Sequence, residues 1–91
     1  MKYLYRATEN FWTQFYRLDS KQKEAARQAW RAFRENPFNA TLRTHKIHRL
    51  SAYYGRTIYA VEILGDLRST FYIEGDMAVS VDIGTHEIYK G

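Results

Sequence analysis

The sequence contains no cysteine. Without thiols, the chain forms neither a disulfide nor a thiolate metal site, and this absence is typical of proteins in a reducing cytoplasm. It also lacks an apolar run long enough to span a bilayer, and residues 1–18 show neither the apolar segment nor the small-residue cleavage site of a signal peptide. We therefore expect a cytoplasmic protein that makes no contact with a membrane.

Several common catalytic motifs are also missing. There is no P-loop, dinucleotide-binding glycine motif, nucleophile elbow or paired-carboxylate signature. The three histidines raise the question of a metal, but His45 and His48 fall on opposite faces of an extended segment. No carboxylate–histidine spacing typical of zinc accompanies them. The sequence therefore predicts no metal and no cofactor.

What the chain does contain is enough apolar surface for one core. Its 91 residues are 45% hydrophobic and 16% aromatic. A chain of this length supports a single two-layer core rather than two separate ones. We expect one folded domain over residues 1–91.

Charge is distributed unevenly along the chain. Residues 1–56 contain twelve Lys and Arg against four Asp and Glu, a net of +8, whereas residues 57–91 contain two against six, a net of −4. Arg27, Arg31 and Arg34 also recur at helical spacing. Such a basic half favours a polyanionic partner, either nucleic acid or an acidic protein segment. The alternative is a solvated cationic surface.

The first half of the chain predicts a strand and two helices. Residues 2–6 are typical of a short strand, and residues 8–18 of a helix capped by its threonine. Asp19 and Gln22 form a capping box that opens a second helix, which Pro37 ends. With almost no loop between them, the two helices are expected to form an αα-hairpin.

The second half predicts strands. Residues 45–50 are expected to be extended, followed by a turn over residues 51–55. Three further strands are expected over residues 57–64, 67–74 and 77–83, joined by Gly-Asp turns. Alternation places four side chains of the last strand on one apolar face: Met77, Val79, Val81 and Ile83. The predicted class is α+β, an N-terminal strand and a helical hairpin packed on a mainly antiparallel sheet of four to five strands.

Three residues near the C-terminus are candidates for chemistry. Arg68, on the strand face away from the apolar one, is suited to hold a phosphate; the alternative is an ordinary exposed arginine. His86 is suited to transfer a proton near neutral pH; the alternative is an inert surface histidine. Tyr89 is suited to bond a phosphate or stack on a base; the alternative is a hydrophobic anchor for the tail.

Residues 45–49 form a second, cationic candidate. In an extended segment His45 and Arg49 point one way, and Lys46 and His48 point the other. Positive groups with an imidazole on one face suit contact with phosphates.

Four short motifs carry a resemblance to a known family. They are Leu-Arg-Thr-His-Lys-Ile at 42–47, Gly-Arg-Thr-Ile-Tyr at 55–59, Asp-Leu-Arg at 66–68 and Ile-Gly-Thr-His-Glu-Ile-Tyr at 83–89. The last is similar to the glycine–x–histidine ending, followed by tyrosine or phenylalanine, of the RelE/ParE toxin superfamily of bacterial toxin–antitoxin systems. The chain resembles this superfamily over nearly its whole length.

The resemblance implies a function. It is strongest to the mRNA interferases, especially the YafQ-like branch, which enter the ribosomal A site and cut mRNA without a metal through attack of the 2′-hydroxyl on the adjacent phosphate. This reaction needs a base, an acid and cationic support. The implied partners are the ribosome, mRNA and a cognate antitoxin, with a dimer or a heterotetramer with the antitoxin as the assembly.

The resemblance also implies roles for individual residues. His45, Asp66, Arg68 and His86 match the catalytic positions. Placement then suggests the roles: His86 lies beyond the last strand and next to Arg68 if the last two strands form a hairpin, so we assign His86 as the acid and His45 as the base, with Arg68 stabilising the phosphorane and Asp66 orienting a neighbour. The third-strand histidine of the YafQ-like branch corresponds here to about Ala60. The residues expected to contact RNA are Lys46, Arg49, Arg56, Tyr89 and Lys90.

Two other functions share this fold. One is a catalytically silent module that still binds an antitoxin, and the other is a ParE-like inhibitor of DNA gyrase. The antitoxin is expected to lie across the basic, active-site side of the sheet, where Tyr53 and Tyr54 supply aromatic contacts.

Overall fold

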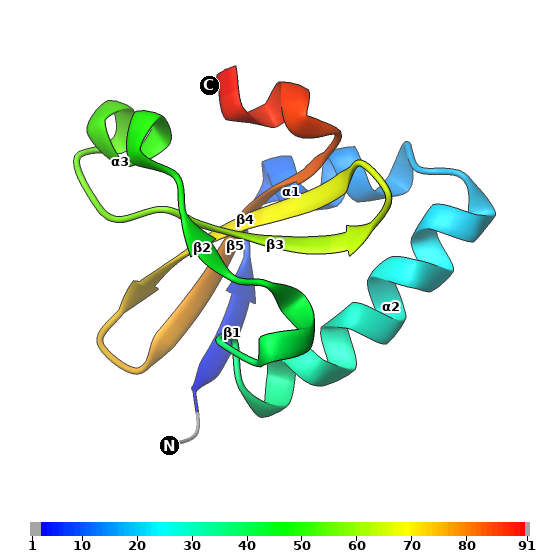
Figure 1. Ribbon diagram of the computed structural model, residues 1–91, viewed down its shortest axis with the longest axis horizontal. Coiled ribbons are helices and arrows are strands. Elements are labelled where there is room, and N and C mark those ends of the chain that lie inside the picture. Colours follow the sequence, from blue (N-terminus) through cyan, green and yellow to red (C-terminus); the bar gives the residue numbers. More distant parts are fainter. Residues whose placement is uncertain (1–2, 91) are drawn as a thin grey trace.

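The computed structural model describes residues 3–90, so Met1 and Lys2, the latter part of the predicted first strand, lie outside the described residues. The elements in chain order are β1 (Leu4–Ala7), α1 (Glu9–Tyr16), α2 (Ser20–Glu35), the 3₁₀ helix η1 (Ala40–Leu42), β2 (His45–Lys46), α3 (His48–Tyr54), β3 (Tyr59–Leu64), β4 (Leu67–Glu74), β5 (Met77–Gly84) and the 3₁₀ helix η2 (His86–Lys90) (Figure 1). The class is α+β, as predicted.

The five strands form one mixed sheet in the order β1-β5-β4-β3-β2. Only β1 and β5 run parallel; the remaining neighbours are antiparallel. Helices α1 and α2 cover one face of this sheet, and α3 and η2 lie over the other (Figure 1).

Both long helices begin where the sequence predicts, and α2 also ends there, whereas α1 ends at Tyr16, two residues before the predicted end. The Thr8 hydroxyl accepts a bond from the Phe11 amide at the start of α1. Asp19 and Gln22 form the predicted capping box: the Asp19 carboxylate accepts from the Gln22 amide at 2.8 Å, and the Gln22 side chain accepts from the Asp19 amide at 3.1 Å. Helix α2 ends before Pro37, because the residue preceding a proline avoids helical backbone angles.

The main core lies between α2 and the centre of the sheet. Phe71 of β4 is 1% exposed, and its ring meets Phe33 of α2 edge to face at 4.8 Å between centroids. The other buried members of this cluster are Leu42, Val61 and Ala78. Aromatic pairs in this geometry stabilise a core beyond the burial of their area.

Strand β5 contains a β-bulge at Val81, which faces no partner residue on the described part of β4. The extra residue reverses the side-chain alternation. Ile83 therefore joins Ala26 and Leu67 in the core beneath the helices, whereas Val79 lies on the opposite face. The predicted single apolar face of residues 77–83 is wrong for this reason.

The bulge also fixes helix α1 to the sheet. The backbone carbonyl of Val81 accepts hydrogen bonds from the Thr8 hydroxyl at 3.2 Å and from the Asn10 side-chain amide at 2.9 Å. The Val81 carbonyl, at the bulge, is thus hydrogen-bonded to side chains at the start of α1, as expected for a half-buried polar group.

Residues 45–50 are not continuously extended, and residues 51–55 are not a simple turn. Strand β2 contains only two residues, and α3 begins directly after Ile47. Leu50, which is 3% exposed, anchors the helix to the sheet, and Gly55 ends it with a positive φ of 69°. Burial of one leucine thus overrides the alternating pattern of the segment.

Within residues 3–90, no helix combines the length and the hydrophobicity that crossing a bilayer requires.

Candidate active site

The candidate site forms where the C-terminal tail leaves β5, next to β4. Arg68 of β4 pairs with Gly84 at the end of β5, and η2 starts two residues later. A side chain at Gly84 would place its Cβ 2.9 Å from the Ile88 methyl group, closer than such contacts normally come. Glycine at this position therefore lets η2 lie directly against the sheet.

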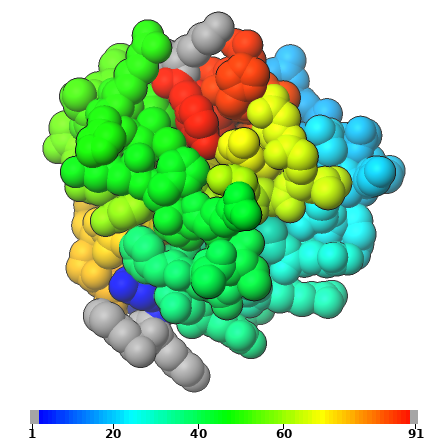
Figure 2. Space-filling model, viewed as in Figure 1, coloured from blue at the N-terminus to red at the C-terminus, as the bar shows by residue number. Residues whose placement is uncertain are grey.

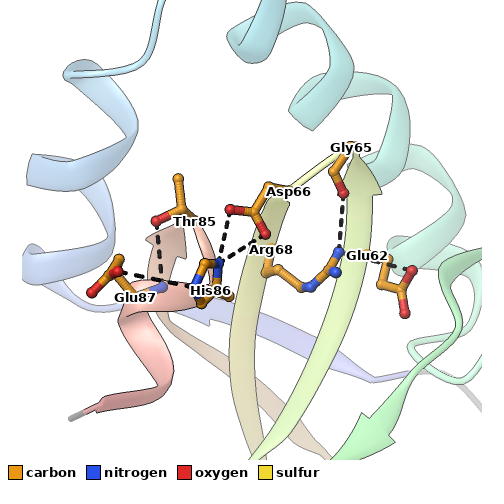
Figure 3. A network of polar contacts seen from close by, with 7 residues as sticks. All are labelled: Glu62, Gly65, Asp66, Arg68, Thr85, His86 and Glu87. Atoms are coloured by element: carbon orange, nitrogen blue, oxygen red, sulfur yellow. Dashed lines mark hydrogen bonds and ion pairs between the residues drawn. The ribbon is translucent and has the colours of Figure 1, made fainter.

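The tail brings His86 to Asp66. The Nδ1 atom of His86 lies 3.0 Å and 3.2 Å from the two carboxylate oxygens of Asp66, in the turn between β3 and β4 (Figure 3). Both side chains remain more than half exposed. The hydrogen bond from His86 lowers the pKa of Asp66 below its ordinary value.

Arg68 lies beside this pair. Its Nη1 donates to the Gly65 carbonyl at 3.2 Å and lies 3.8 Å from the Glu62 carboxylate. Figure 3 shows the guanidinium directed toward Gly65 and Glu62 and away from the His86 ring. The side chain is 21% exposed, so solvent reaches it.

Tyr89 packs against the same group. Its hydroxyl is buried and has no hydrogen-bond partner among residues 3–90. Burial raises the pKa of Tyr89, and the nearby positive charge of Arg68 opposes that rise. Tyr89 is therefore a half-buried anchor for the tail whose hydroxyl lies near Arg68.

The structure thus brings together four of the predicted residues: Asp66, Arg68, His86 and Tyr89. It does not bring His45 into contact with them. His45 lies on β2, two strands away from β4, and pairs with Ala60 of β3. Its Nδ1 is hydrogen-bonded to the Arg43 carbonyl at 2.8 Å. The sheet register places His45 on the same face as Arg68, at an exposed position.

The residues predicted to contact RNA occupy different surroundings. Lys46 and Arg49 are exposed. Arg56 is engaged, because its guanidinium lies 4.1 Å over the Tyr72 ring and 3.0 Å from the Glu74 carboxylate. The side chain of Lys90 lies outside the described part of the chain.

Glu62 belongs to the site although the sequence did not single it out. It pairs with Arg68 across the β3–β4 hairpin. Counting back from the Gly65-Asp66 turn would have placed Ile63 opposite Arg68. An irregularity between Glu62 and Leu64 shifts the register by one residue and brings Glu62 there instead, so local counting could not have found it.

No group of three or more histidines and carboxylates in residues 3–90 is arranged to hold a metal ion. The side chains that approach one another here are instead those of acid–base and phosphate chemistry: an imidazole bonded to a carboxylate, a guanidinium and a phenol.

Comparison with known proteins finds no protein-family model, no curated protein and no solved structure that matches this chain. The case for a function therefore depends on the geometry described above and on the short motifs of the sequence.

The Asp66–His86 pair predicts a titration that depends on the histidine. Because the pKa of Asp66 is lowered in the folded state, the pair stabilises the fold above the ordinary aspartate range, near 3.9, and that contribution is lost as pH falls. Carbon-detected NMR of the Asp66 carboxyl should show a midpoint below that range. In His86→Ala the midpoint should rise toward it.

The matched control is His48→Ala, which removes an imidazole from α3 and should leave the Asp66 midpoint unchanged. Equal midpoints in the parent and in His86→Ala would show that the bond in Figure 3 is not formed in solution.

Proposed function

We propose that this protein is the toxin of a toxin–antitoxin system, a ribosome-dependent and metal-independent mRNA endoribonuclease of the RelE/ParE superfamily that acts in the cytoplasm. The observation that carries the proposal is His86, bonded to Asp66 beside Arg68 on one face of the sheet. The α+β class, with two helices over a five-stranded mixed sheet, is compatible with it.

The proposed reaction is an internal transfer of the phosphate. The 2′-hydroxyl loses its proton to a base and attacks the adjacent phosphorus, and the bond to the 5′-oxygen breaks as that oxygen takes a proton from an acid. The products are a 2′,3′-cyclic phosphate and a 5′-hydroxyl. A cation near the phosphate stabilises the charge that builds up in the transition state.

His86 is suited to be the acid. Asp66 holds its Nδ1 nitrogen, and Nε2, on the other side of the ring and 3.9 Å from the Glu87 carboxylate, is the nitrogen proposed to exchange protons with the substrate. This is the geometry in which a carboxylate orients a catalytic imidazole. Asp66 is thus a positioning residue, in the role the motif implied.

Arg68 is suited to hold the phosphate. Its planar guanidinium matches phosphate oxygens with two parallel donors. Its guanidinium turns toward Gly65 and Glu62 in the structure. We propose that phosphate binding draws it from these two oxygens toward His86.

Two residues on this face are suited to be the base. His45 stands beside Ala60, the position of the third-strand histidine in the YafQ-like branch, so an imidazole still occupies the neighbourhood of that missing group. Glu62 lies closer to Arg68. We assign the base to His45, with Glu62 as the competing carboxylate.

The central prediction is that His86→Ala cuts a ribosome-bound message about 10²–10⁴-fold more slowly than the parent, because a positioned acid contributes a factor of that order. The measurement is in vitro cleavage by purified protein, with thermal melting to show that the exposed substitution leaves the fold intact. His48→Ala is the control and should cut normally, since His48 lies on α3 and not with the pair.

The same assay identifies the base. His45→Ala should lose more activity than Glu62→Gln if the assignment is right, and a larger loss in Glu62→Gln would transfer the role to the carboxylate. Cleavage by His86→Ala at the parent rate would contradict the proton-transfer role altogether and favour the silent antitoxin-binding module.

A different surface is suited to the antitoxin. A groove of about 390 Å³, open to solvent, lies between α1, α2 and the sheet. No residue of α1, all of which is described, is fully buried, and Trp12, Tyr16 and Trp30 are 46%, 68% and 38% exposed. Exposed apolar surface of this extent is typical of a docking site.

The charges around the cavity indicate the occupant. Arg27 lines it, with its guanidinium 5.8 Å from the centre of the Phe15 ring, and Arg31 and Arg34 continue the stripe along α2. We propose that an acidic amphipathic helix of the antitoxin lies in this groove, its apolar side against the aromatics and its carboxylates against the arginines. The sequence instead favoured the basic, active-site side of the sheet for the antitoxin.

Trp12→Ala should weaken binding of the antitoxin by about 30-fold, or 2 kcal/mol, because a large aromatic at the centre of an interface typically contributes this much. Calorimetric titration with the product of the adjoining small reading frame measures it. Tyr53→Ala, on the opposite face, is the matched control. Weaker antitoxin binding in Tyr53→Ala, with unchanged binding in Trp12→Ala, would indicate that the antitoxin binds the active-site side instead.

A further inference from the structure

The candidate site by itself is poorly equipped to attract RNA. Around Arg68 and His86 stand three carboxylates, those of Glu62, Asp66 and Glu87. Neutralisation of phosphates by lysine and arginine supplies much of the affinity for nucleic acid. A protein that cuts RNA at this site therefore needs cationic contacts from residues next to it.

The neighbouring stretch of the chain has the required charge. Residues 36–61 contain no Asp or Glu and four Lys and Arg: Arg43, Lys46, Arg49 and Arg56. This stretch includes α3, which packs against η2, the segment that carries His86. Figure 2 shows the green atoms of this region directly beside the red atoms of the tail.

Two tyrosines stand out on α3. Tyr53 is 72% and Tyr54 is 49% exposed, and their rings meet edge to face at 5.0 Å between centroids. Arg49 lies one turn before Tyr53 on the same side of the helix and forms no ion pair or side-chain hydrogen bond with any other residue in 3–90. We call Arg49, Tyr53 and Tyr54 the α3 surface.

The α3 surface stands on a fixed support. Leu50 is buried beneath it, and the Ser51 hydroxyl accepts a bond from the Ile58 amide at 2.8 Å. Arg56 holds the end of the helix to the sheet through Tyr72 and Glu74. The rings are thus presented by a helix that is tied down on both sides, which lowers the cost of ordering them on binding.

We propose that the α3 surface binds single-stranded RNA next to the cut phosphate, with bases stacked on Tyr53 and Tyr54 and a phosphate held by Arg49. The choice of RNA as ligand rests on the proposed function. Exposed aromatic rings beside cations are the means by which proteins bind single strands without sequence preference.

The composition of the helix favours RNA over a protein partner. Its exposed residues are His48, Arg49, Ala52, Tyr53 and Tyr54. Exposed leucine, isoleucine or valine is absent from α3, which is described in full, whereas the groove between α1 and α2 is lined mainly by apolar groups. The α3 surface therefore fits a nucleic acid, whereas the groove between α1 and α2 fits an amphipathic helix.

The experiment measures binding of a fluorescent, unstructured RNA oligonucleotide to the full chain by anisotropy, without ribosomes. Tyr53→Ala should raise Kd about five- to tenfold, the lower range for loss of one stacked base. Tyr53→Phe should bind like the parent, since the ring face is retained. Tyr16→Ala, an equally exposed tyrosine on α1, is the control and should change nothing.

Salt dependence tests the phosphate contact. Arg49→Gln should reduce the slope of log K against log salt by about 0.7, the value for one phosphate of a single strand, whereas Arg31→Gln on α2 should leave the slope unchanged. Parent-like affinity in Tyr53→Ala together with a parent-like slope in Arg49→Gln would overturn the proposal. Weaker binding of the antitoxin, but not of RNA, in Tyr53→Ala would assign the surface to a protein instead.

Failure of this proposal is distinguishable from failure of the proposed function. If the protein is not a nuclease, ribosome-bound message stays whole while the oligonucleotide still binds through Tyr53. If only the α3 surface is wrong, the message is cut and Tyr53→Ala cuts it as fast as the parent.

Discussion

The candidate site depends on the packing of the short tail η2 against the end of strand β5, next to β4. Gly84 permits that contact, because any side chain there would meet Ile88. Once the tail lies on the sheet, His86 reaches Asp66 in the turn between β3 and β4, and Tyr89 is half-buried beside Arg68. Loosening of this contact would separate His86 from Arg68.

The two faces of the sheet are used differently. On one, α1 and α2 leave their aromatic side chains partly uncovered and the core open between them. On the other, α3 and η2 pack together and hold the polar groups of the candidate site. The bulge at Val81 reverses the alternation of side chains along β5, so that Ile83, near the end of the strand, lies on the face covered by the helices. The proposed binding surfaces for an antitoxin and for a nucleic acid therefore lie on opposite faces of the sheet.

Local signals in the sequence predicted much of this arrangement. The capping box at Asp19, the stop at Pro37 and the Gly-Asp turns depend on neighbouring residues alone, and each appears in the structure. The pairing of Arg68 with the end of β5 followed from the hairpin. Three features could not be predicted in this way: the bulge, helix α3 and the role of Glu62. They depend respectively on the bonds of the Val81 carbonyl to Thr8, on the burial of Leu50, and on the pairing of Glu62 with Arg68 in the neighbouring strand.

Analysis of the ends of a cut message tests the central claim most directly. If the imidazoles and Arg68 promote attack by the 2′-hydroxyl, message on purified ribosomes treated with this protein carries 2′,3′-cyclic phosphate and 5′-hydroxyl ends. A 2′-deoxy nucleotide at the cut position then abolishes cleavage. Ends bearing a 5′-phosphate, cleavage of the 2′-deoxy message, or a message that stays intact would contradict the account.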